Sequence, residues 1–321
     1  MSLKETVKML SDYEYNGEHP IAIVGPDGSD ESVLRVYAYG GRIGYIQISD
    51  GKFTQISTKG KKAYTKYLQL GEYCFGSNKK TRLNDLSVLK SKYPISDQKN
   101  NYEKQFSDMN DKTDINKYLD FIITATYNKQ RRLHPDTKDY EAYAPNEKTV
   151  QCEITKRFMR GGEKRGWCVC DFEYQDNTYK TEGKIGGRID LVIYDYKRKQ
   201  FGLVELKLDN DSTNNIEKHY EDSKNLINNK NVINNIKKRC NALEKAGLID
   251  PINNDDTMWF GFLFVGGKLE SSAKLINNRS KVFADKENCR FRYVENIDQL
   301  ETNGLAFDSM EKFDKFTSKA K

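Results

Sequence analysis

The stretch Gly186–Lys207, "GGRIDLVIYDYKRKQFGLVELK", contains two apolar segments that each carry charged residues. Because side chains alternate along a strand, Glu205 and Lys207 lie on the same face of the second segment. If the two segments form a hairpin that turns at residues 197–198, antiparallel pairing sets Asp190 opposite Glu205, with Cβ atoms about 5 Å apart. Facing carboxylates repel each other, so this register requires something that offsets the repulsion.

A divalent cation would offset it, because carboxylate oxygens on adjacent strands are hard ligands that suit Mg²⁺. This ion commonly keeps several waters and takes further ligands from a phosphate group. Lys207, beside such an ion, would orient or help to deprotonate a water and stabilise charge on the phosphate. The alternative is that Asp190 and Glu205 lie in solvent at strand ends and that Lys207 pairs with one of them.

The surrounding pattern predicts the element order αβββαβ. Its members are a helix at 146–160, strands at 166–175, 188–195 and 201–207, a helical region at 213–246 with a break near 228–231, and a strand at 258–267. The last strand returns after a helical crossover, which requires a parallel neighbour. We therefore expect an α/β fold with a mixed sheet flanked by helices.

With this order, residues 146–267 resemble the PD-(D/E)XK nuclease superfamily, which has the restriction-endonuclease-like fold. The resemblance implies that Asp190 is the metal-binding Asp of the second core strand. It likewise implies that Glu205 and Lys207 are the Glu-x-Lys of the third strand, and that the backbone carbonyl of Leu206 joins the metal shell. No Pro precedes Asp190, a departure that many members share.

Members of the superfamily often add a Glu from the first core helix. On the helix at 146–160, Glu147 lies on the same stripe as Val150 and Ile154, whereas Glu153 lies roughly 100° from Ile154. Glu147 is therefore the candidate for a further catalytic and metal-binding carboxylate. The alternative is a favourable acid in the first turn of a helix, behind an Asn cap.

The N-terminal part of the chain has a different pattern. Short alternating segments between His19 and Ser57, separated by Gly-, Asp- and Ser-containing turns, predict a small antiparallel meander. The next segment, Lys59–Lys99, holds ten basic residues against three acidic ones, with Tyr and Phe interleaved. This composition is typical of a surface that contacts phosphates, although a solvated lysine-rich face remains the alternative.

These patterns predict two domains, an N-terminal β-rich basic module at 1–110 and a nuclease-like domain at 111–321. Within the second, the helix after the third strand carries two polar residues four apart, which share a helix face and which similar nucleases would place near the phosphate. The candidate nucleic-acid contacts are Lys61, Lys62, Lys66, Lys79, Lys80, Arg82, Arg188, Tyr220 and Lys224.

Composition limits the class of protein. The chain of 321 residues is 37% hydrophobic and 31% charged, so it can bury a sizeable core, and it has no apolar run of membrane-spanning length and no signal-peptide pattern. Its six cysteines are scattered, without a zinc motif or a dense disulfide framework. We expect a cytoplasmic protein with reduced thiols.

Together with the resemblance, these features predict a Mg²⁺- or Mn²⁺-dependent phosphodiesterase, with a DNA endonuclease of restriction or defence type as the first interpretation. RNA cleavage by the same site stays open, because the chemistry does not distinguish the sugar. A nucleic-acid-binding or assembly protein that uses the fold as a scaffold also stays open. Many members of the superfamily pair to cut both strands, which leaves a homodimer open as well.

Overall fold

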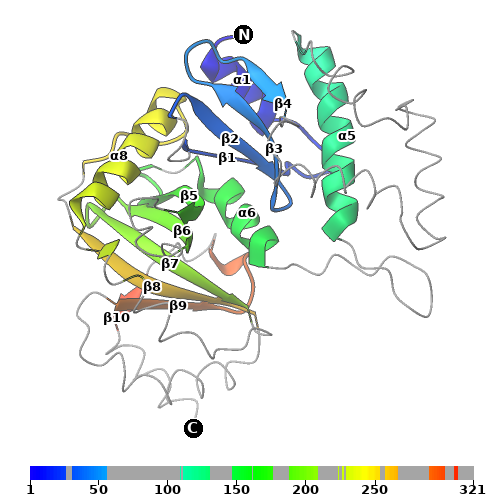
Figure 1. Ribbon diagram of the computed structural model, residues 1–321. Helices are drawn as coiled ribbons and strands as arrows, with labels where there is room; N and C mark the ends of the chain where they lie inside the picture. Colours follow the sequence, from blue (N-terminus) through cyan, green and yellow to red (C-terminus); the bar gives the residue numbers. More distant parts are fainter. Residues whose placement is uncertain are drawn as a thin grey trace, which may run out of the picture. The chain divides into compact units, whose positions relative to one another are not determined.

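The computed structural model describes residues 1–26, 31–55, 109, 111–130, 147–160, 162–175, 188–208, 223, 226–227, 229–253, 257–266, 289–300 and 307–309. The chain divides into two compact units, each with its own sheet (Figure 1). The first unit comprises Met1–Ile23 and Ser32–Glu153, and the second comprises Val24–Glu31 and Ile154–Lys321.

The first unit contains the meander predicted from the sequence. Its strands β1 (Ile21–Val24), β2 (Val33–Ala38), β3 (Gly41–Gln47) and β4 (Phe53–Gln55) lie side by side in chain order, with helices α1 (Leu3–Ser11) and α5 (Lys112–Gln130) in the same unit. Tyr39 and Gly40 form a two-residue turn between β2 and β3, both with positive φ. Such a turn follows the natural twist of a hairpin, and glycine adopts it without steric cost.

Helix α5 is joined to this sheet by a buried hydrogen bond, in which the hydroxyl of Tyr118 donates to the carbonyl of Ile43 at 2.5 Å. We expect Tyr118→Phe to lower the free energy of unfolding by about 1–2 kcal/mol, because it leaves a buried carbonyl without this donor. Urea denaturation followed by circular dichroism measures the change. An unchanged midpoint and slope would mean that the carbonyl is satisfied in another way.

The second unit contains a six-stranded sheet of order β10-β9-β8-β7-β6-β5, in which β7 and β8 are the two central strands (Figure 1). Pairing is antiparallel for β5–β6, β6–β7 and β9–β10, and parallel for β7–β8 and β8–β9. The mixed sheet predicted from the sequence is therefore confirmed. The strands are β5 (Trp167–Gln175), β6 (Arg188–Asp195), β7 (Gln200–Leu208), β8 (Met258–Val265), β9 (Cys289–Val294) and β10 (Asp308–Ser309).

Helices flank this sheet. Helix α6 (Glu147–Phe158) crosses the boundary between the units, and its last residue packs its ring on Trp167 of β5 with centroids 4.0 Å apart. Helix α8 (Lys230–Lys245) begins after Asn229, whose side chain accepts hydrogen bonds from the first-turn N–H groups. This N-cap accounts for the break expected near 228–231, because its extended backbone ends any preceding helix.

A buried ion pair fixes α8 against the sheet. Arg239 of α8 pairs with Asp171 of β5, and its guanidinium lies 4.4 Å from the centroid of the Tyr174 ring. Asp171 follows a β-bulge, where the register between β5 and β6 shifts by one residue at Cys170. A bulge re-aims the side chains beyond it, and here it directs a carboxylate to the helix.

The cysteines of the described residues are thiols, and all of them are buried. Cys168 and Cys170 lie close together, with their sulfur atoms 3.9 Å apart. Burial raises the pKa of the Cys170 and Cys240 thiols, so both remain protonated and poorly nucleophilic. In the part of the chain that the structure describes, no helix has the length and apolar character needed to cross a bilayer.

Candidate functional site

The candidate site lies at the open end of the β6–β7 hairpin. Residue pairs from Asp195 with Gln200 to Leu191 with Val204 form the antiparallel ladder, which is the register expected from the sequence. One step beyond its last pair, the same register brings Asp190 level with Glu205. The ladder stops there, although β6 still pairs with β5 at Ile189 and β7 still pairs with β8 beyond that level. The two strands therefore part at a fork.

The carboxylate of Asp190 lies inside this fork. Its Oδ2 atom accepts a buried hydrogen bond of 2.7 Å from the backbone N–H of Leu206. The N–H and C=O groups of one strand residue face the same edge of the strand. The carbonyl of Leu206 therefore faces the edge on which Asp190 lies, which is the edge that the predicted metal shell requires.

Lys207 completes the cluster, with its Nζ atom 3.5 Å from Oε2 of Glu205. The relative exposures of Asp190, Glu205 and Lys207 are only 6%, 1% and 9%. The alternative in which the two carboxylates lie in solvent is therefore wrong. The ion pair between Lys207 and one of the carboxylates, which that alternative also expected, is present. Burying ion pairs commonly costs as much desolvation energy as the attraction returns, so stability gives little reason to keep these charges here.

The neighbouring strand gives this cluster an apolar wall. In the parallel ladder Glu205 lies beside Phe262, and Lys207 lies beside Phe264. The two phenylalanine rings stack with centroids 6.1 Å apart. Charges beside such a wall are poorly screened by water, so their attraction for an ion or a phosphate is stronger than at an exposed surface. The sequence predicted a parallel neighbour for the strand at 258–267, but it did not predict which residues would lie side by side, because a long crossover separates β7 from β8.

Glu147 is the first residue of α6. This position agrees with the alternative interpretation, in which Glu147 is a stabilising acid in the first turn of the helix and not a metal ligand. It is half-buried, and its Oε1 atom accepts a hydrogen bond of 3.3 Å from Gln151 one turn later. It belongs to the first unit, whereas Asp190 and Glu205 belong to the second. Its role as a further metal ligand stays a prediction.

Of the predicted nucleic-acid contacts, the described residues include Arg188 alone. It lies exposed at the start of β6 and pairs with Glu173 of β5, so its charge is partly balanced within the sheet. The predicted contacts outside the described residues are Lys61, Lys62, Lys66, Lys79, Lys80, Arg82, Tyr220 and Lys224.

The donor set at the fork suits a hard cation that does not require a complete protein cage. Within the described ranges, no group of three or more His, Cys, Asp and Glu side chains comes together in a metal-binding arrangement. The fork offers two carboxylates and the Leu206 carbonyl, all of which are oxygen donors. Mg²⁺ is commonly bound by one or two carboxylates, with waters and substrate phosphates as its other ligands.

Comparisons of the chain with models of protein families, with curated proteins and with solved structures found no match.

Proposed function

We propose that this protein is a metal-dependent nuclease that hydrolyses phosphodiester bonds, with a DNA endonuclease of restriction or defence type as the first candidate. One observation carries the proposal, namely the burial of Asp190, Glu205 and Lys207 together at the fork between β6 and β7. Strongly charged clusters that add little to stability are typical of functional sites.

The strand order supports the same proposal. The elements from α6 to β8 follow the αβββαβ order, in a mixed sheet whose antiparallel hairpin carries the charges. We therefore propose the restriction-endonuclease-like fold for the second unit. In that fold the fork would receive the phosphate group, and β8 would form the wall behind it.

Each group at the fork has a role in this chemistry. Asp190 and Glu205, with the Leu206 carbonyl, would hold Mg²⁺ or Mn²⁺, and the hydrogen bond from the Leu206 N–H would keep Asp190 in position. When bound, the ion supplies Lewis-acid polarisation of the phosphate oxygens. The ammonium of Lys207 would orient the attacking water and stabilise the negative charge that develops on the phosphate.

Cleavage assays on several substrates test the proposal. Circular DNA, linear DNA and RNA are each incubated with the full chain in Mg²⁺, Mn²⁺ or EDTA. We expect metal-dependent cutting of circular DNA, which requires an endonuclease because the substrate has no ends. Cutting of RNA alone would favour the same site with a different substrate. If the protein bound DNA or RNA but cut neither in Mg²⁺ nor in Mn²⁺, the result would favour the scaffold interpretation.

The basic segment Lys59–Lys99 gives a separate prediction about binding. Replacing Lys61, Lys62 and Lys66 with alanine should weaken the affinity for duplex DNA. The slope of log affinity against log salt should fall by about 0.9 for each phosphate that the variant no longer neutralises, because fewer counterions are released. A salt titration by fluorescence anisotropy measures both effects. An unchanged slope would make this segment a solvated face that does not touch DNA.

A further inference from the structure

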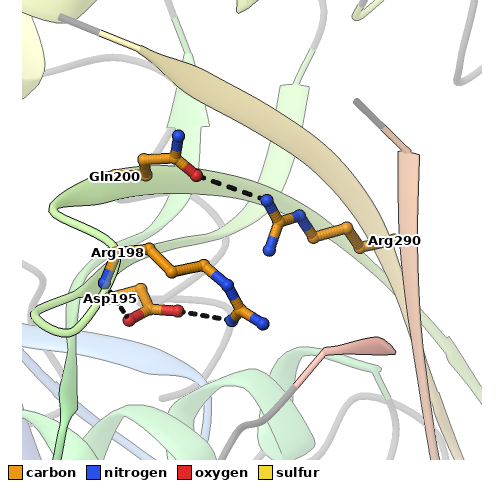
Figure 2. Close-up of polar contacts among 4 residues, drawn as sticks. All are labelled: Asp195, Arg198, Gln200 and Arg290. Atoms are coloured by element: carbon orange, nitrogen blue, oxygen red, sulfur yellow. Dashed lines mark hydrogen bonds and ion pairs between the residues drawn. The ribbon is translucent and has the colours of Figure 1, made fainter. Parts of the chain in front are cut away.

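A second charged cluster lies at the closed end of the β6–β7 hairpin. The turn there comprises residues 196–199, and Asp195 before it accepts two hydrogen bonds from Arg198. One comes from the backbone N–H at 2.9 Å and one from Nη1 at 2.8 Å. Because both ends of Arg198 are held by one carboxylate, its side chain folds back along the hairpin (Figure 2).

Arg290 reaches the same place from β9. Its guanidinium lies 5.1 Å from the centroid of the Trp259 ring on β8, and its Nη2 atom donates to Oε1 of Gln200 on β7 at 3.3 Å. Figure 2 shows Arg198 and Arg290 extending toward each other. Stacking on Trp259 and the bond to Gln200 hold the second guanidinium in place.

Among the described residues, these two guanidinium groups have more N–H donors than acceptors, and more positive charge than Asp195 balances. Each guanidinium carries five N–H donors, whereas Asp195 and Gln200 are the only acceptors of these side chains among the described residues. Burial, and then the nearby charge of Arg198, lowers the pKa of Arg290, while Asp195 opposes that shift. Lys197 in the same turn adds further positive charge.

This cluster is distinct from the fork. Gln200 and Lys207 are at opposite ends of β7, seven residues apart in number, which corresponds to about 23 Å along a strand. Side-chain alternation also places Gln200 on the opposite face of the sheet from Glu205 and Lys207. A phosphate bound at the turn is therefore not the phosphate that the fork would attack.

We propose that Arg198 and Arg290 form a phosphate-binding site at the turn between β6 and β7. One guanidinium group pairs with a planar carboxylate, whereas two guanidinium groups, one from the turn and one from β9, match the tetrahedral oxygens of a phosphate. The phosphate belongs either to the backbone of a nucleic acid or to the end of a nucleotide. Either source supplies negative charge in addition to that of Asp195.

Calorimetric titration of inorganic phosphate into the EDTA-treated full chain, in chloride buffer, tests this site. We expect saturable binding that weakens at least about tenfold in Arg198→Gln and in Arg290→Gln, since each change removes charge-assisted hydrogen bonds. The Arg198 side chain is 45% exposed, so its replacement leaves the fold intact even if that of Arg290 does not. Lys230→Gln is the matched control, because this exposed lysine begins α8 in the same unit and does not belong to the turn.

Competition identifies the source of the phosphate. Displacement of inorganic phosphate by an oligonucleotide without terminal phosphates indicates backbone contacts, and displacement by a nucleoside monophosphate alone indicates a terminal phosphate. Asp190→Ala should bind phosphate at the turn as the unmodified chain does, which separates this site from the proposed nuclease site. Absence of saturable binding, or equal affinity in Arg198→Gln and Lys230→Gln, would overturn the proposal.

Discussion

Asp190→Ala and Glu205→Ala are each expected to lower the rate of metal-dependent DNA cleavage by at least about 10²-fold, the scale seen when one preorganised electrostatic group is lost. Either change removes a carboxylate from the fork and weakens its hold on a divalent cation. Single-turnover cleavage of labelled circular DNA in Mg²⁺ measures the loss. Undiminished cutting by both variants would remove these residues from the site.

Matched variants separate lost chemistry from lost folding. Asp190→Asn keeps an oxygen that can accept the Leu206 N–H bond, whereas Asp190→Ala leaves that buried donor without it. We therefore expect the alanine variant to lose about 1–3 kcal/mol of stability and the asparagine variant to lose less, although both lose activity. Circular dichroism and urea denaturation provide the check. If only the alanine variant lost activity, Asp190 would be a structural residue.

Lys207→Ala is expected to lower the single-turnover rate strongly while metal binding and DNA affinity stay nearly intact. An interaction that strengthens only as the phosphate changes contributes to the transition state and not to the bound substrate. Lys207→Arg should not restore the rate, because a planar guanidinium cannot take the place of a compact, buried ammonium. The Nζ atom of Lys207 lies 3.5 Å from Oε2 of Glu205. Rapid-quench kinetics at saturating protein measures the rate.

The opposite pattern would assign Lys207 a different role. If Lys207→Ala lost affinity with an unchanged rate at saturation, the residue would bind phosphate without taking part in the chemistry, and the scaffold interpretation would gain support. Lys164→Ala, which removes an exposed lysine elsewhere in the second unit, serves as the control for net charge.

The hairpin of β6 and β7 was predictable because its signals are local. Strand alternation and a short connection determine which residues face one another, and the observed ladder follows that register. The meander was predictable for the same reason. The parting of the strands at Asp190 was not, because it depends on a hydrogen bond from a backbone group of the partner strand.

Other features depend on distant segments, and one helix has a local signal at its N-terminus. Ser2 and Glu5 form a capping box at the start of α1, a motif that could have predicted this helix. The strand β9 and the contact of Arg290 with Gln200 depend on which strands become neighbours. Alternation along one strand contains no information about that choice, so the cluster at the turn was visible only in the structure.

The most direct measurement is the rate at which EDTA-treated protein cuts circular DNA before and after Mg²⁺ is added back, with Glu205→Gln tested in parallel. Glu205→Gln keeps the volume of the side chain and removes its charge, so it changes the proposed ion site with the least disturbance of packing. We predict no cutting in EDTA, full recovery with Mg²⁺ for the unmodified chain, and at least about 10²-fold less recovery for Glu205→Gln. Cutting that persists in EDTA, or equal recovery in the variant, would contradict a metal-dependent site at the fork.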